Sequence, residues 1–137
     1  MKRDKYDKIF SDLIRERADH TCEFCGLYIG KTLSCHCCHI HGRSSRSVRW
    51  DADNALCLCA KHHFFYTNHP TDFFVWLRDY LGEGYLEILS EKAHTVKKWT
   101  KADKADLYAH YKSEYKHMLE QRKQGVTGRI TFLNYGF

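Results

Sequence analysis

The sequence predicts an α+β fold, mostly helical, in which amphipathic helices flank a small strand–hairpin–helix unit held by a metal ion. Apolar residues recur at helical spacing near both ends of the chain, which is typical of amphipathic helices. The central segment is instead rich in Cys and His and carries two metal-binding pairs, Cys22-x-x-Cys25 and Cys59-x-x-His62. With 137 residues, the chain is long enough for one domain with one modest core.

That single domain, residues 1–137, divides into four parts. Residues 6–18 are expected to form an N-terminal helix, residues 20–70 the metal-bound core, residues 71–124 a set of C-terminal helices, and residues 125–137 a tail that is either a strand or an irregular arm. Glycines and a suitable N-cap residue separate the C-terminal helices from one another. These helices are expected over residues 71–81, 85–93 and 101–123.

Within the core, the pattern predicts two strands followed by a helix. Residues 35–41 form the first expected strand and residues 47–50 the second, with a polar, basic loop between them. Residues 51–54 have turn chemistry, so a helix is expected to begin near Ala55. It should end around Pro70, because proline cannot continue a helix.

The composition favours a cytoplasmic protein and permits a polyanionic partner. Lys and Arg number 22 against 17 Asp and Glu, which gives a formal charge of +5. Seven Cys cannot all pair as disulfides, and no segment has the apolar core of a signal peptide or the roughly 20 apolar residues of a membrane span. In the reducing compartment predicted from these features, closely spaced Cys and His are expected to be metal ligands.

The first predicted site is a structural zinc ion held by Cys22, Cys25, Cys59 and His62. Zinc takes four such ligands in a tetrahedron, and two residues spaced three apart on a turn can both reach one ion. The hairpin would lie between the two pairs, so the ion would staple its flank to its helix. Spacing favours His62 as the fourth ligand; the other candidates nearby are His63, Cys35, Cys37 and Cys57.

A second constellation resembles a known nuclease family. His39, Asn54 and His63, on a strand–hairpin–helix pattern, are similar to the motif of HNH endonucleases, also called ββα-metal or His-Me finger nucleases. The run HIHGR followed by VRWDADNALCLC resembles phage HNH proteins related to the NinG recombination nucleases, and the resemblance covers roughly residues 20–123. It implies a zinc-stapled ββα-metal finger with flanking helices.

The resemblance also implies a role for each residue of the motif. His39 is the general base that activates a water molecule, Asn54 holds the loop geometry, and His63 binds a catalytic divalent cation at the scissile phosphate. A neutral imidazole, with an ordinary pKa of about 6.5, suits proton removal near neutral pH. The implied cation is Mg²⁺ or Mn²⁺, with Ni²⁺ or Zn²⁺ as alternatives.

The sequence departs from the family pattern at one position. Many HNH motifs carry an Asp directly before the base His as a second metal ligand, whereas this chain has Cys38 there. A thiolate is a poor partner for Mg²⁺. The second ligand therefore stays open between Cys38, His36 and His41.

A basic loop after His39 is the expected contact with nucleic acid. Arg43, Arg46 and Arg49 lie close together there, and guanidinium groups bind phosphate through paired hydrogen bonds. Arg43, the nearest to His39, is also a candidate to stabilise the transition state. Lys61 is a further candidate contact.

These patterns favour a metal-dependent DNA endonuclease that hydrolyses phosphodiester bonds. The resemblance implies a phage or prophage origin and a role in DNA recombination, repair or processing. The expected partner is double-stranded or branched DNA, with no membrane contact, and the chain is expected to be a monomer or a homodimer. The alternative is a non-catalytic zinc-stapled DNA-binding module; a zinc-binding protein-interaction domain is a third, weaker hypothesis.

Overall fold

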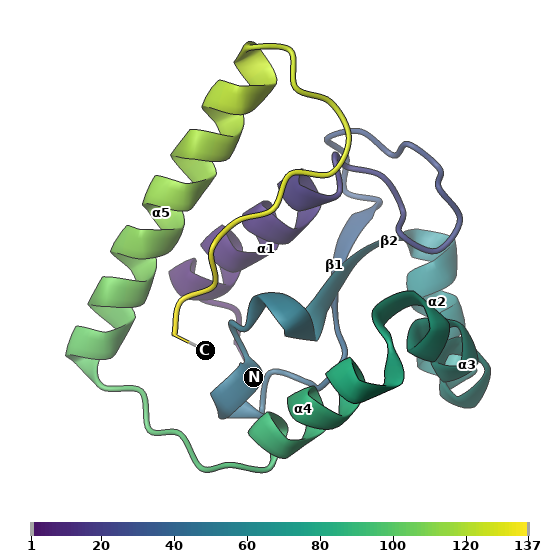
Figure 1. Cartoon of the computed structure of the whole chain (residues 1–137), viewed down its shortest axis with the longest axis horizontal. Helices are drawn as coiled ribbons and strands as arrows, with labels where there is room; N and C mark the ends of the chain where they lie inside the picture. The colour runs from purple at the N-terminus through teal and green to yellow at the C-terminus, as the bar shows by residue number, and fades with distance from the viewer. Residues whose placement is uncertain (1, 137) are drawn as a thin grey trace.

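The computed structural model describes residues 2–136, and within them the chain forms five α-helices and one small antiparallel sheet (Figure 1). The helices are α1 (Lys5–Arg17), α2 (Ala60–Asn68), α3 (Pro70–Leu81), α4 (Glu83–Ala93) and α5 (Lys101–Lys123). The strands are β1 (Cys35–His39) and β2 (Ala55–Cys59), and two 3₁₀ turns, η1 (Arg46–Val48) and η2 (Ala52–Asn54), lie between them. The predicted class, α+β and mostly helical, is confirmed.

The two strands form the centre of the molecule. They pair in a register that places Cys35 opposite Cys59, and β2 is buried over its whole length. Because successive side chains of a strand point to opposite faces, Cys57 packs towards α1 and α5, whereas Leu58 packs towards α3 and α4. The hairpin is therefore enclosed by helices on both faces.

The second strand and the start of α2 differ from the sequence prediction. Residues 47–50, expected as a strand, include part of the turn η1, and Ala55–Cys59, expected as the first turns of a helix, form β2. A strand buried on both faces is a continuous apolar run, which periodicity alone does not separate from a buried helix. The expected order of strand, strand and helix is kept, but the second strand and the helix begin later in the chain than expected.

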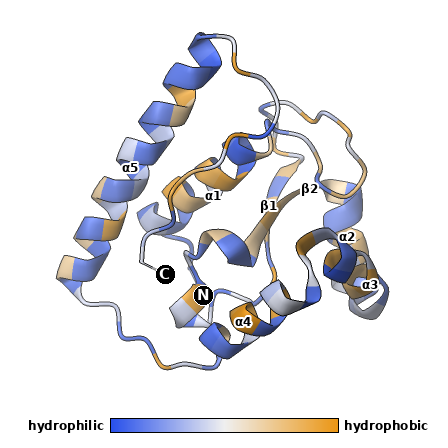
Figure 2. Cartoon of the chain, viewed as in Figure 1, coloured by the Kyte–Doolittle hydropathy of each residue, from blue (hydrophilic) through white to orange (hydrophobic). Residues whose placement is uncertain are grey.

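The longest helix, α5, begins and ends at the residues expected from the sequence. The Thr100 hydroxyl accepts from the Asp103 amide, and the Asp103 carboxylate accepts from the Thr100 amide, which forms a capping box. The helix is mostly hydrophilic (Figure 2) and buries Leu107, Tyr111 and Met118 in the core that it shares with α1. Its position against α1 therefore depends on a narrow apolar stripe.

The described part of the tail, residues 124–136, is an irregular arm that runs along α1 (Figure 1). The Ile130 amide donates to the Arg17 carbonyl at 3.1 Å, and the Asn134 side chain accepts from the Ala52 amide at 2.9 Å. The arm is thus attached both to α1 and to the turn that precedes β2. Among residues 2–136, no helix is long and apolar enough to cross a bilayer.

Candidate functional site

Four residues from separate parts of the chain bring their ligand atoms together. Cys22 and Cys25 lie in the turn after α1, Cys59 ends β2, and His62 lies in the first turn of α2. Their sulfur and nitrogen atoms all lie within 4.8 Å of one another. The residues predicted as one metal site therefore form a cluster that can hold a metal ion.

The donors and surroundings of this Cys22 cluster fit a closed structural site. His62 Nδ1 lies 3.2 Å from Cys59 Sγ and 3.8 Å from Cys22 Sγ. The Phe24 ring stacks on the His62 ring, with centroids 4.5 Å apart, and covers one side of it. Gly26, at a φ of +75° that suits glycine, closes the turn by donating to the Cys22 carbonyl. A tetrahedral ion bound by these three sulfurs and one nitrogen would have no position left for a substrate.

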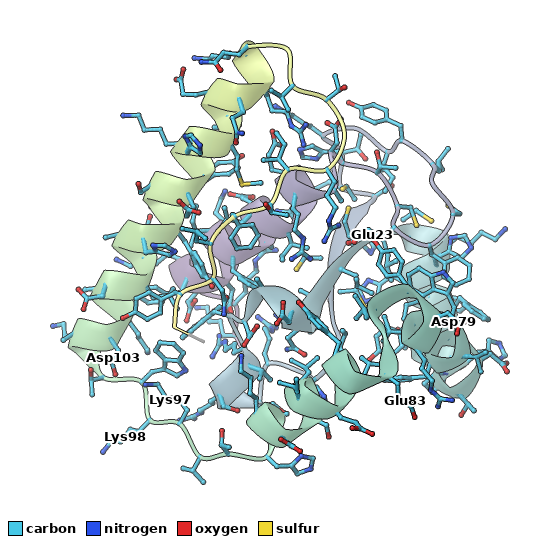
Figure 3. The ribbon with its side chains drawn as sticks, in the orientation of Figure 1. Glu23, Asp79, Glu83, Lys97, Lys98 and Asp103 are labelled. Carbon is cyan, nitrogen blue, oxygen red and sulfur yellow. The ribbon has the colours of Figure 1, made fainter. Side chains whose placement is uncertain are left out.

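Glu23 fastens the cysteine turn to β2. Its amide donates to the Cys57 carbonyl at 2.8 Å, and its Oε2 accepts from the Cys57 amide at 2.7 Å. Its Oε1 accepts from the Tyr80 hydroxyl and from Arg129, so α3 and the tail meet at this carboxylate as well (Figure 3). The turn is therefore held to the hairpin by protein hydrogen bonds in addition to any metal ion.

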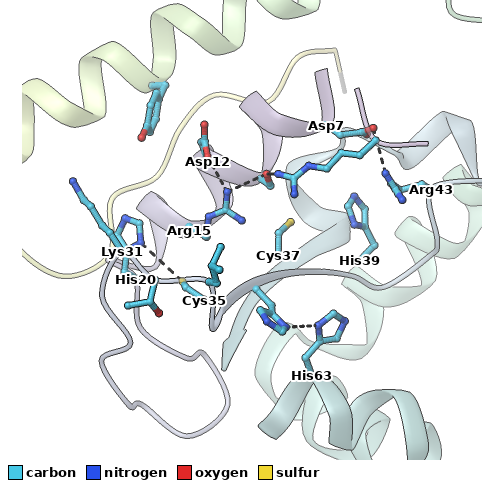
Figure 4. A pocket seen from close by; sticks show the side chains of 16 residues that line it. Asp7, Asp12, Arg15, His20, Lys31, Cys35, Cys37, His39, Arg43 and His63 are labelled. Carbon is cyan, nitrogen blue, oxygen red and sulfur yellow. Dashed lines mark hydrogen bonds and ion pairs between the residues drawn. The ribbon is translucent and has the colours of Figure 1, made fainter. Parts of the chain in front are cut away.

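A cavity of about 770 Å³ lies beside β1, with α1 and the loop of residues 31–33 in its walls (Figure 4). Four of the predicted site residues line it: His36, His39, Arg43 and His63. They come from β1, from the loop that follows it and from α2. The fold therefore gathers residues that lie up to 27 positions apart in the sequence around one space.

Two histidines meet at this cavity. His36 Nδ1, on β1, lies 2.9 Å from His63 Nδ1, on α2. Cys38 lies on the same face of β1 as His36 but is buried, with its sulfur 3.9 Å from the His39 carbonyl. Burial also raises the pKa of the Cys38 thiol well above its ordinary value. Of the alternatives for a second metal ligand, His36 is the one in contact with His63.

Asn54 is fully buried and holds the loop between the strands. Its Oδ1 accepts from the His41 amide at 2.8 Å, and its Nδ2 donates to the carbonyls of His41 and Val48 at 2.8 and 3.0 Å. Three hydrogen bonds from one side chain fix the exit of β1 relative to η1. The role that the resemblance implies for Asn54 in a nuclease site stays a prediction. His41 is not among the described residues that line the cavity.

His39 is oriented by the same loop. Its Nε2 lies 3.0 Å from the Arg49 carbonyl, and because a carbonyl only accepts, Nε2 carries the proton and Nδ1 the lone pair. Burial lowers the pKa of His39, although the Arg49 carbonyl and the Asp7 carboxylate act in the opposite direction. A neutral imidazole with a lone pair beside a cavity has what a general base requires.

Arg49 does not lie on a phosphate-facing surface, which corrects the expectation for this residue. Its Nε and Nη2 donate to the Asp7 carboxylate at 2.9 and 2.6 Å, and Trp50 Nε1 donates to the same group at 2.9 Å. Burial alone would raise the pKa of Asp7, but these hydrogen bonds and one with the Asp4 backbone lower it well below its usual range. The buried guanidinium therefore joins the loop to α1.

The other three expected contacts with nucleic acid are placed differently. Arg43 lines the cavity, with its guanidinium 3.5 Å from the Asp7 carboxylate. Arg46 is exposed on η1, where its carbonyl accepts from Trp99, and Lys61 is exposed on α2. Neither of these two is among the described residues that line the cavity.

Three further basic side chains in the cavity, Arg3, Arg15 and Lys31, were not predicted from the sequence. The sequence prediction for α1 rests on its apolar face alone. A signal was present on the opposite face, because Arg3, Asp7, Ser11 and Arg15 recur every four residues. Such spacing gives a helix one polar stripe, and here that stripe lines the cavity.

No protein family model, curated protein or solved structure matches this chain. Membership of the HNH family, suggested by the resemblance, therefore stays a prediction. The function has to be inferred from the residues that meet in the Cys22 cluster and in the cavity.

Proposed function

We propose that the protein is a divalent-metal-dependent DNA endonuclease with a ββα-metal, or HNH, finger. The observation that carries the proposal is that His39, which ends β1, and His63, on α2, line one cavity while Asn54 fixes the loop after β1. The order of strand, strand and helix that carries these residues matches the order in such a finger. The proposed substrate is double-stranded or branched DNA, in the setting of phage recombination, repair or processing in a bacterial cytoplasm.

In this proposal, His39 takes a proton from a water molecule in the cavity. The lone pair lies on Nδ1, because Nε2 is bound to the Arg49 carbonyl, and that hydrogen bond also fixes the ring. The activated water attacks the phosphorus atom while the bond to the leaving oxygen breaks. General base catalysis of this kind typically contributes about 10²- to 10⁴-fold to a rate.

His36 and His63 are proposed to hold the catalytic cation. Their Nδ1 atoms lie 2.9 Å apart, near the roughly 3 Å expected of two imidazole nitrogens that share an ion at about 2.1 Å. A cation there supplies positive charge to the scissile phosphate. Imidazole pairs favour Ni²⁺ or Zn²⁺ over Mg²⁺, which prefers oxygen ligands. A second ligand from His36, rather than from an acidic residue next to His39, would therefore shift the metal preference.

The Cys22 cluster is proposed to hold a structural Zn²⁺ ion. Thiolates and an imidazole are the donors that zinc prefers, and four of them form a closed site. Cys59 and His62 belong to β2 and α2, so the ion would fix the start of the helix that carries His63. In this arrangement, zinc positions the catalytic histidine without contacting the substrate.

The charge on the cavity walls supports a polyanionic substrate. Its two carboxylates are already engaged, since Asp7 pairs with Arg49 at 2.6 Å and Asp12 with Arg15 at 2.8 Å. The basic residues that line the cavity are Arg3, Arg15, Lys31 and Arg43. A wall of this kind favours phosphate groups over neutral or cationic ligands.

A nicking assay on supercoiled plasmid, run with Mg²⁺, Mn²⁺, Ni²⁺ and Zn²⁺, tests the proposal. The wild-type chain should nick DNA in a metal-dependent manner, and His39→Ala should lose nicking while keeping its circular dichroism spectrum and DNA affinity. His94→Ala is the matched control, because His94 is exposed at the end of α4 and does not line the cavity. Failure to cut duplex, branched or single-stranded DNA with every metal would exclude a nuclease.

One observation favours the second candidate, a non-catalytic zinc-stapled DNA-binding module. The position where the family carries an acidic metal ligand holds Cys38, and that thiol is buried. A module of this kind would bind DNA with an affinity that falls as salt rises, and it would not cut DNA with any metal. The same nicking assay, combined with a binding titration, separates the two candidates.

A further inference from the structure

Two thiols touch on the face of the hairpin that packs towards α1. Cys35 Sγ lies 3.3 Å from Cys57 Sγ, and neither residue belongs to the Cys22 cluster. The strand register pairs Cys35 with Cys59 and Cys37 with Cys57, so the two thiols are diagonal neighbours across β1 and β2. Neither thiol has a part in the proposed hydrolysis.

The two thiols differ in their access to solvent. Cys35 is 4% exposed and lines the cavity together with His20 (Figure 4), whereas Cys57 is 0% exposed and is not among the described residues that line it. A small reagent that enters the cavity can therefore contact Cys35, whereas Cys57 lies behind the cavity lining. This difference gives the two sulfurs distinct roles in any reaction with such a reagent.

Cys35 has a second polar neighbour in His20. His20 Nδ1 lies 3.9 Å from Cys35 Sγ (Figure 4), and His20 Nε2 lies 2.6 Å from a Glu16 carboxylate oxygen. Because the carboxylate accepts the Nε2 proton, Nδ1 faces the thiol as an acceptor. Asp19 and His20 both have positive φ values, 54° and 52°, which residues other than glycine rarely adopt, and the contact with Glu16 orients the imidazole ring.

We propose that Cys35 and Cys57 form a peroxide-reactive thiol pair, in which Cys35 is the reacting sulfur and Cys57 the resolving one. The Cys35 sulfur attacks one oxygen of a hydroperoxide, the O–O bond breaks, and the other oxygen leaves with the thiol proton as water or an alcohol. The Cys57 sulfur then attacks the Cys35 sulfur, the S–O bond breaks, and the oxygen leaves as water with the Cys57 proton. Two electrons pass from the two thiols to the peroxide, and a disulfide remains.

The two sulfurs need to move only a short distance to form a bond. A disulfide bond is about 2.05 Å long, so the two sulfurs have to approach by roughly 1.3 Å. Cys37 provides the matched comparison, because it lies on the same face of β1, lines the same cavity and is directly opposite Cys57. It is Cys35, however, whose sulfur contacts that of Cys57.

Oxidation of the zinc-loaded full chain with hydrogen peroxide tests the proposal without any nuclease assay. Remaining thiols are alkylated with N-ethylmaleimide, and the linkage is mapped by tandem mass spectrometry. We expect one disulfide, between Cys35 and Cys57, with the bound zinc retained and with full reversal by dithiothreitol. Cys37→Ser should form the same linkage.

Two further variants separate the roles of the sulfurs. In Cys57→Ser, the reaction should stop at a sulfenic acid on Cys35, which dimedone traps, and in Cys35→Ser neither dimedone adduct nor disulfide should appear. If Cys57→Ser does not fold, the linkage map of the wild-type chain still decides. A first disulfide through Cys37, or oxidation of the zinc-binding thiols before Cys35, overturns the proposal.

Discussion

The two groups of side chains proposed as metal sites differ in how completely the protein surrounds them. In the Cys22 cluster, four ligand atoms lie within 4.8 Å of one another, and the Phe24 ring covers His62. In the cavity, two imidazoles meet at 2.9 Å, and about 770 Å³ of space with basic walls lies beside them. A closed donor set serves to hold structure, whereas an open one leaves coordination positions for phosphate and water.

Helix geometry explains how neighbouring residues reach different sites. Successive side chains on an α-helix point about 100° apart. His62 therefore turns back towards Cys59, three residues earlier, while His63 points across to His36 on β1. Two adjacent residues of α2 thus belong to different proposed sites, so a point mutation can change one site at a time.

Breaking the closed site should have the largest effect. Cys59→Ser removes a thiolate ligand, and a structural zinc site contributes on the order of 10 kcal/mol to folding. We expect loss of bound zinc and of the cooperative thermal transition, measured by metal analysis and circular dichroism. Cys37→Ser, outside the cluster, should keep the zinc and shift Tm by only a few degrees. Full zinc content and an unchanged Tm in Cys59→Ser would rule out the closed site.

The adjacent histidines give the sharpest separation of the two sites. His63→Ala should reduce metal-dependent nicking by about 10³-fold, because the cation loses a ligand, while zinc content and Tm stay unchanged. His62→Ala should instead lose zinc. His62→Cys, which completes a four-cysteine set, should keep both zinc and nicking. Loss of zinc in His63→Ala would show that the two histidines have been assigned to the wrong sites.

The residues of the closed site could be predicted from the sequence because their chemistry is local. Each pair spans four positions on one turn, and its spacing identifies it without knowledge of the fold. The same holds for α5, whose capping box at Thr100 and Asp103 marks its start. In these two places the signal lies within a few residues, and the sequence prediction and the structure agree.

The open site could be predicted only in part because its contacts join distant residues. The pairing of His36 with His63 spans 27 positions, so the sequence left His36 among three alternatives. The pairing of Arg49 with Asp7 spans 42 positions, and nothing near Arg49 distinguishes it from a basic residue on a solvent-facing loop. The boundaries of β2 were missed for a different reason, since all five of its residues are buried.

The Asp7–Arg49 pair supports the wall of the open site, and breaking it should have an intermediate effect. Asp7→Asn removes the carboxylate that pairs with the buried Arg49 guanidinium at 2.6 Å and leaves the more distant Asp4 carboxylate at 3.5 Å. This loss should lower the free energy of unfolding at pH 7 by about 3 kcal/mol. Urea denaturation measures this change. Zinc content should stay the same, because the pair does not touch the Cys22 cluster.

The pH dependence of the same pair has a definite sign. The hydrogen bonds to Asp7 hold its pKa below the unfolded value, so its contribution is present above about pH 4 and is lost as the pH falls further. The difference in unfolding free energy between wild type and Asp7→Asn should therefore narrow as the pH falls below about 5, because an ordinary carboxyl group has a pKa of about 3.9. A gap that widens in acid would contradict the assigned direction.

The smallest expected effect concerns the basic wall, which belongs to the open site alone. Arg15→Gln removes one cation from the cavity, so DNA affinity should fall by roughly 3- to 10-fold and the slope of log affinity against log salt should decrease by about 1. Fluorescence anisotropy with a labelled duplex, in EDTA so that no cleavage occurs, measures both quantities. Lys98→Gln makes the same change in net charge at an exposed residue outside the described cavity lining, and it should leave the slope unchanged. Equal losses of affinity in the two variants would mean that DNA binding depends on the overall charge of the protein, and that the phosphate backbone does not bind in the cavity.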